Sequence, residues 1–146
     1  MALAGAVAVT VSACAGGTAP RGPATAALPP GCYSLSLGAW SKTPEASPPP
    51  GELRLLDSLG TDGMERNQKL VRNLNPDSTT RYWMWWDHRL ADSLRLVFST
   101  GFVGVVVDVE RHETTWDGRA SAFTDMVVVG VPEPRASATL APRACP

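Results

Sequence analysis

The residues 82–86, Tyr-Trp-Met-Trp-Trp, carry the most unusual chemistry in this sequence. Successive side chains of a β-strand point to opposite faces, so Trp83 and Trp85 would share one face and Met84 and Trp86 the other. Large aromatic faces line pockets for apolar molecules or stacked sugars, and they also fill cores. The residues that the pocket interpretation assigns to the lining are Trp40, Trp83, Trp85, Phe98 and Phe102. The core interpretation stays open beside it.

Two short segments combine a histidine with carboxylates, which are ligand types for a mixed nitrogen and oxygen metal site. The first holds Asp87-His88 and Asp92, and the second holds His112-Glu113 and Asp117. Neither spacing is that of a known ligand motif, and a metalloprotease helix would need a second histidine. We therefore expect solvated turns here, with no metal and no cofactor.

Catalytic motifs are also missing from the sequence. It contains neither the G-x-S-x-G nucleophile elbow nor a P-loop. Asp108 and Glu110 share one face of a predicted strand and have the residue types of a glycosidase pair, but a solvated strand face is the much better explanation. The sequence therefore predicts a noncatalytic protein.

Length and charge set the class of protein. A chain of 146 residues corresponds to about one domain. Its net charge is only −1, and its arginines are scattered singly, without a basic stripe. The electrostatic signature of a nucleic-acid-binding protein is therefore absent, and no nucleic-acid partner is expected.

The first residues are typical of an export signal. Residues 2–13 carry no charge and are too few to span a bilayer, which takes about 20 residues, but they suit the apolar region of a secretory signal. Val11-Ser12-Ala13-Cys14 then resembles the lipobox of bacterial lipoproteins. That resemblance implies removal of residues 1–13, acylation of Cys14 and attachment to the cell envelope. An ordinary cleaved signal and a chance cysteine in an Ala/Gly-rich tail are the alternatives.

The same resemblance implies a location and a domain boundary. Ala15, in place of Asp, directs such lipoproteins to the outer membrane, where they face the periplasm. Residues 15–30 are almost entirely small residues and proline, which cannot bury apolar surface. Residues 14–30 are therefore predicted to be a lipidated tether, and residues 31–146 the folded domain.

Two cysteines remain once Cys14 is assigned to lipid. Cys32 and Cys145 lie at the start and end of the predicted domain. An exported protein encounters oxidising conditions, so we predict a disulfide between them, with two free thiols as the alternative. The bridge would bring the first and last strands together.

The domain reads as short antiparallel strands. Period-2 alternation of apolar and polar residues is clear in 32–37 and 93–99, and β-branched or aromatic runs add further strands. The expected strands are 32–37, 52–56, 69–72, 79–86, 93–99, 103–110, 119–123 and 135–142, with a β-branched run at 127–131. Residues 64–74 fit a strand or a short helix, and Trp116-Asp117-Gly118 reads as a hairpin turn. About eight strands with joined ends predict a small all-β antiparallel barrel, with a sandwich as the alternative.

Gly38-Ala39-Trp40 resembles the G-x-W motif of lipocalin-like calycin barrels. The resemblance implies that Trp40 plugs the closed end of the barrel. Gly31-Cys32-Tyr33 and Ser99-Thr100-Gly101-Phe102 are similar to segments of a small family of bacterial lipoproteins, which implies no function. We expect noncatalytic binding of a small apolar or amphiphilic ligand in the barrel. The alternative is a structural or partner-docking lipoprotein with a filled core, whose protein partner the sequence does not identify.

Overall fold

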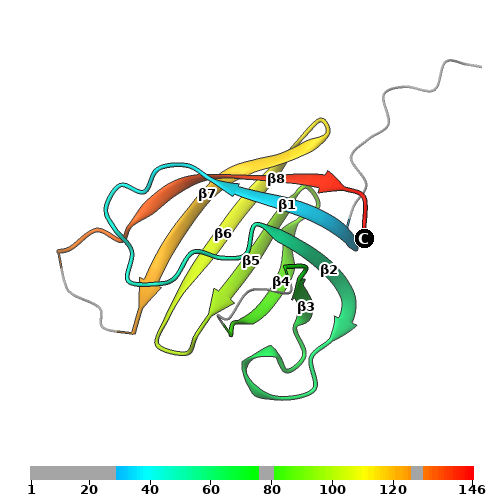
Figure 1. The fold of residues 1–146 in the computed structure, drawn as a ribbon, viewed down its shortest axis with the longest axis horizontal. Coiled ribbons are helices and arrows are strands. Elements are labelled where there is room, and N and C mark those ends of the chain that lie inside the picture. Colours follow the sequence, from blue (N-terminus) through cyan, green and yellow to red (C-terminus); the bar gives the residue numbers. More distant parts are fainter. Residues whose placement is uncertain (1–28, 76–80, 126–129) are drawn as a thin grey trace, which may run out of the picture.

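The computed structural model describes residues 29–75, 81–125 and 130–146. Its eight strands form a closed antiparallel barrel in which each strand pairs with its neighbours in sequence and the last pairs with the first (Figure 1). This confirms the predicted barrel over the sandwich. The strands are β1 (Gly31–Leu37), β2 (Glu52–Leu59), β3 (Lys69–Asn73), β4 (Trp83–Leu90), β5 (Ser93–Ser99), β6 (Val103–His112), β7 (Thr115–Thr124) and β8 (Arg135–Arg143).

Apolar side chains fill the inside of the barrel. In β5 and β6 the alternating residues turn inward, so that Leu96 pairs with Val107 and both are fully buried. A small eight-stranded barrel has an interior that side chains alone can fill. The largest fully buried side chains are Trp86, Trp116, Tyr33, Phe98, Leu53, Leu55, Leu94, Leu96 and Leu140. These residues form the hydrophobic core of the barrel.

The seam that closes the barrel lies between β1 and β8. Six registered pairs run along it, from Cys32 with Arg143 to Leu37 with Ala138. At one end of the seam Cys32 and Cys145 form a disulfide, with their Cα atoms 5.2 Å apart. The predicted bridge is therefore confirmed, and it lies where the start of β1 meets the end of β8.

Three local predictions need correction. Residues 64–74, expected to be either a strand or a short helix, contain part of each, because a short 3-10 helix, η1 (Gly63–Glu65), precedes β3. The strand predicted to end at Trp86 continues to Leu90, so part of the segment expected to be a loop belongs to β4. The β6–β7 hairpin turns between His112 and Thr115, which form the last pair of its ladder.

The hairpin turn predicted at Trp116-Asp117-Gly118 is wrong, since these residues lie inside β7. Gly118 has another role there. A Cβ at this position would lie 2.1 Å from the carbonyl oxygen of Asp108 on β6, so the glycine permits the close approach of two strands.

The barrel has two different ends. The hairpin end holds the start of β1, the turns 91–92 and 113–114 and the end of β8, whereas the loop end holds the loop 38–51, the turn 100–102 and the segment 130–134. In Figure 1 the long loop after β1 lies on the left, opposite the C-terminus. Within the part of the chain that the structure describes, no helix has the length and apolar character needed to cross a bilayer.

Candidate functional site

The wall of the barrel divides the aromatic residues of β4. Trp86 pairs with Leu96 and is fully buried inside the barrel. Trp83 and Trp85 share the opposite face of the strand, and Trp83 remains 42% exposed there. The predicted alternation of the two faces is therefore confirmed. The inner face belongs to the core, and the outer face lies on the surface.

The five residues predicted to line a pocket do not share one cavity. Phe98 is buried inside the barrel, whereas Trp83 and Trp85 belong to the outer side of the wall. Phe102, in the turn 100–102, is 77% exposed, and Trp40 packs half-buried against the core just after β1. A single ligand inside the barrel cannot contact all five.

Trp86 is held by contacts on its edge and on its face. Its indole Nε1 donates a hydrogen bond of 2.9 Å to the carbonyl oxygen of Leu56. The Lys69 ammonium lies 4.8 Å from the centre of its ring and 2.7 Å from Asp57 Oδ1. The tryptophan thus has a cation over its face, and a carboxylate fixes that cation.

Trp116, at the hairpin end, also has a cation over its ring, but its buried indole Nε1 has no hydrogen-bond partner among the described residues. The Arg111 guanidinium carbon lies 5.9 Å from the centre of the Trp116 ring, and Arg111 forms an ion pair with Asp92. The backbone N–H of Arg111 also donates to the carbonyl oxygen of Asp92, at 2.9 Å. Trp116 is fully buried. Trp40, to which the calycin resemblance assigned the plugging role, lies at the other end of the barrel, the loop end, where it packs against the core.

Charged side chains form a ladder across the outer face of the sheet. Asp87 pairs with Arg95, Arg95 with Asp108, and Asp108 with Arg119, so the charges alternate in sign from β4 to β7. Arg95 binds both oxygens of Asp108, with N–O distances of 2.6 and 2.8 Å, and these hydrogen bonds raise the pKa of Arg95. One member of the glycosidase pair considered above is therefore held in a two-pronged ion pair.

The two histidines lie at different places in the fold. His88 is in β4, with its ring 5.2 Å from that of Trp86, whereas His112 ends β6. Asp117, which the sequence grouped with His112, accepts hydrogen bonds from Thr139 and Thr115. These bonds hold its pKa below the ordinary value. Among the described residues, no three histidines, cysteines or carboxylates are placed to hold a metal ion.

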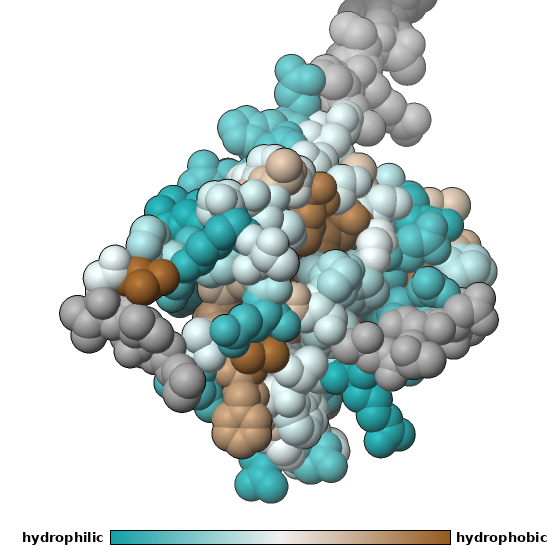
Figure 2. All heavy atoms as spheres, turned by 60° about the vertical axis from the view of Figure 1, so that its left-hand side comes forward, coloured by the Kyte–Doolittle hydropathy of each residue, from teal (hydrophilic) through white to brown (hydrophobic). Residues whose placement is uncertain are grey.

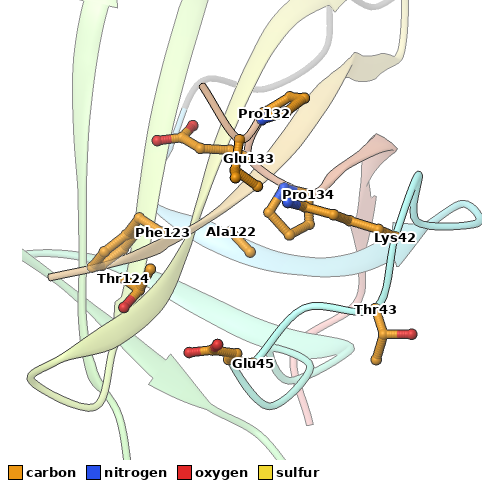
Figure 3. A pocket seen from close by; sticks show the side chains of 10 residues that line it. Lys42, Thr43, Glu45, Ala122, Phe123, Thr124, Pro132, Glu133 and Pro134 are labelled. Atoms are coloured by element: carbon orange, nitrogen blue, oxygen red, sulfur yellow. The ribbon is translucent and has the colours of Figure 1, made fainter. Parts of the chain in front are cut away.

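A hollow of about 280 Å³ lies at the loop end, and we call it the rim hollow (Figure 3). Ala122 and Phe123 of β7 form part of its apolar lining. The loop 38–51 and the segment 130–134 supply the other walls. The residues that line the rim hollow are Lys42, Thr43, Glu45, Ala122, Phe123, Thr124, Val131, Pro132, Glu133 and Pro134.

Backbone hydrogen bonds hold the walls of the rim hollow together. The N–H of Ser41 donates to the carbonyl oxygen of Arg135 at 2.7 Å, and the N–H of Arg135 donates to the Ser41 hydroxyl at 3.0 Å. The N–H of Ala122 donates to the carbonyl oxygen of Pro134 at 3.0 Å. These bonds join the two loops to each other and to β7.

Tyr82 fixes the far side of the same loop. Its hydroxyl donates to the carbonyl oxygen of Pro48 at 2.9 Å, and its ring meets that of Phe98 edge-on at 6.4 Å. Burial raises the pKa of Tyr82, so the hydroxyl keeps its proton at neutral pH and remains a donor. Four prolines in the loop further restrict its backbone.

The rim hollow combines apolar walls with charges at its edge. Lys42, Glu45 and Glu133 are exposed there, and none of them forms an ion pair with another described residue. Figure 2 shows the face that comes forward from the left-hand side of Figure 1, where apolar patches lie among hydrophilic residues. An exposed, mixed surface of this kind suits a small amphiphilic molecule.

Sequence reasoning missed the rim hollow because it treated the proline-rich segment 42–51 only as a loop. The available signal was a second group of prolines, Pro132 and Pro134, next to a predicted strand. Cys14, the predicted lipidation site, lies outside the described residues, as does most of the tether. Comparisons with protein-family models, with curated proteins and with solved structures find nothing that matches this chain.

Proposed function

We propose that this protein is an exported, noncatalytic lipoprotein of the cell envelope that binds a small amphiphilic molecule in the rim hollow. One observation carries the binding site. The rim hollow has apolar side chains among its lining residues and lies between loops joined by backbone hydrogen bonds, whereas aromatic and aliphatic residues form the core inside the barrel. The proposed site is therefore at the loop end instead of inside the barrel.

The lipid anchor is the second part of the proposal, and it depends on the sequence Val11-Ser12-Ala13-Cys14. Two or more acyl chains attach a protein stably to a membrane, where one chain does not. Because β1 begins at the hairpin end, a tether that precedes Gly31 joins the domain at that end. The tether therefore enters the domain at the end opposite the rim hollow.

We expect wild-type protein to incorporate labelled palmitate in cells and Cys14→Ala protein to incorporate none. The labelled band should partition with the membrane fraction, and the variant should leave it. Cys32→Ala serves as the matched control, because it removes a cysteine of the disulfide and keeps Cys14. Label that survives Cys14→Ala would contradict the lipid anchor.

Native mass spectrometry of protein extracted from its own membrane tests the rim hollow. We expect an extra mass of fixed stoichiometry on the folded domain, and we expect Thr43→Trp to remove it. Thr43 is exposed and lines the rim hollow, so an indole there occupies space that a ligand would use. Thr61→Trp is the matched control, since Thr61 is exposed in the loop between β2 and η1.

The outcomes separate the two candidate roles. An extra mass that persists in Thr43→Trp would place the ligand outside the rim hollow. A domain that carries only its anchor would favour the structural or partner-docking role, for which the filled core is the supporting observation. Chemical crosslinking in intact cells would then be the way to identify the partner.

A further inference from the structure

The outer face of β4–β7, whose central strands lie side by side in Figure 1, carries apolar side chains that do not belong to the core. One row near the loop end contains, in strand order, Trp83, Ser99, Gly104 and Phe123. The adjoining row contains Trp85, Val97, Val106 and Ser121. Val97 is only 8% exposed although it lies outside the core cluster, so its neighbours on the outer face cover it. We call these two rows the outer band.

Exposed apolar residues continue the outer band at the loop end. Met64 of η1 lies over the outer face, with its sulfur 4.0 Å from the hydroxyl oxygen of Ser99. Trp83 reaches toward the β5–β6 turn, since a Cβ on Gly101 would lie 3.5 Å from its ring. Six large apolar side chains are exposed among the described residues, and three of them, Met64, Trp83 and Phe102, belong to this region. Clustered exposed apolar side chains mark contact surfaces.

The charged ladder adjoins the outer band on the side of the hairpin end. Its order from β4 to β7 is Asp87, Arg95, Asp108 and Arg119, so the signs are minus, plus, minus and plus. Asp87 remains 43% exposed at one end of the ladder, and Arg119 is exposed at the other. In the reverse direction the sign at every position is the opposite one. The ladder is therefore complementary to a second copy of itself.

Charge also selects between the two symmetric ways of placing the ladder on itself. A two-fold axis along the ladder would bring Asp87 onto Asp87 of the second copy and would join like charges throughout. A two-fold axis parallel to the strands, between β5 and β6, brings opposite charges together. The same axis places Val97 against Val106 of the second copy and Trp83 against Phe123 of the second copy. It also leaves both β1 starts at one end of the dimer, which two tethers in one membrane require.

We propose that the outer band and the charged ladder bind a second copy of this chain, in a two-fold dimer whose axis runs parallel to the strands between β5 and β6. A lipid surface fits this face less well, because it would desolvate the ladder without supplying the alternating charges that match it. Four strands and three rows cover roughly 400 Å² per copy, compared with about 800 Å² per partner in a standard interface. The dimer is therefore weak and depends on concentration.

An exchange of charge between two variants tests the dimer. Asp87→Lys places a cation opposite Arg119 of its own second copy, and Arg119→Glu places an anion opposite Asp87. Each variant alone should therefore dimerise at least about tenfold more weakly than the wild type. An equal mixture of the two should form a heterodimer about as tight as the wild-type dimer, because both contacts then join opposite charges. Sedimentation velocity of the full chain measures the affinities, and native mass spectrometry identifies the heterodimer by its mass.

Glu113→Lys is the matched control, because Glu113 is an exposed carboxylate in the β6–β7 turn, beyond the ladder. It should dimerise like the wild type. Phe102→Glu is a further variant that spares the ladder, since its side chain is exposed and the β5–β6 turn lies on the proposed axis. A carboxylate there would meet its own copy, so this variant should dimerise weakly and should not be restored by mixing with either charge variant.

Three results would overturn the dimer. They are a wild type that is monomeric at every concentration, single charge variants that associate like the wild type, and folded variants whose mixture forms no heterodimer. A monomeric wild type that binds phosphatidylglycerol vesicles, with a tryptophan blue shift that Trp83→Phe removes, would instead assign the outer band to a lipid surface. Circular dichroism checks that each variant is folded.

Discussion

Trp86→Ala is expected to lower the free energy of unfolding by about 3–5 kcal/mol. The indole is fully buried, and the substitution removes its packing, its hydrogen bond to Leu56 and the ring under Lys69. Removal of the ring would leave a cavity at the place where β3 and β4 share only two registered pairs, so little else holds those strands together. Urea denaturation followed by circular dichroism measures the change.

Trp83→Ala is the matched control, since Trp83 lies in the same strand and remains 42% exposed. Its loss should cost at most about 1 kcal/mol, as for most surface substitutions. An equal loss of unfolding free energy in the two variants would mean that Trp86 does not pack in the core while Trp83 lies on the surface. The comparison therefore tests the assignment of the two faces directly.

Removal of the disulfide is expected to lower the free energy of unfolding by about 3–5 kcal/mol, because the bridge spans 113 positions of the chain. For a domain of this size the thermal midpoint should fall by about 15 °C. The native circular dichroism spectrum should stay the same, since the six pairs between β1 and β8 close the barrel without the bridge. Calorimetry of Cys32→Ala combined with Cys145→Ala gives the measurement.

Reduction of the wild-type protein is the parallel experiment. A reductant should lower the midpoint of the wild type to that of the double variant and leave the variant unchanged. A wild-type midpoint that does not respond to reduction would show that the bridge contributes nothing to the stability of the folded domain. A changed spectrum in the double variant would instead show that closure of the barrel depends on the covalent link.

The architecture could be predicted because its signals are local or covalent. Alternation along 93–99 and 103–110 reflects the burial of one face of each strand, and period 2 makes such burial visible in sequence. The disulfide between Cys32 and Cys145 then restricts which strands can be neighbours. The sequence wrongly predicts a hairpin turn at Gly118, because a glycine that permits close strand approach looks the same in sequence as one in a hairpin turn.

The candidate site was harder to predict because it depends on contacts between distant segments. The two walls of the rim hollow are joined by a hydrogen bond between Ser41 and Arg135, 94 positions apart. The cation over Trp86 likewise comes from another strand, since Lys69 pairs with Trp86 across β3 and β4. A pattern within one segment cannot reveal contacts between distant segments. The sequence therefore identified the aromatic residues but did not show which of them face the inside of the barrel and which face the outside.

The disulfide at the seam also determines how this domain bears mechanical force. Tension applied between the chain before Gly31 and the last residue, Pro146, passes through the covalent bond from Cys32 to Cys145. The residues between the two cysteines are outside that load path, so the hydrogen bonds between strands do not bear the applied force. Pulling on the two ends would therefore extend only the outer segments and leave the barrel folded until the bridge is reduced.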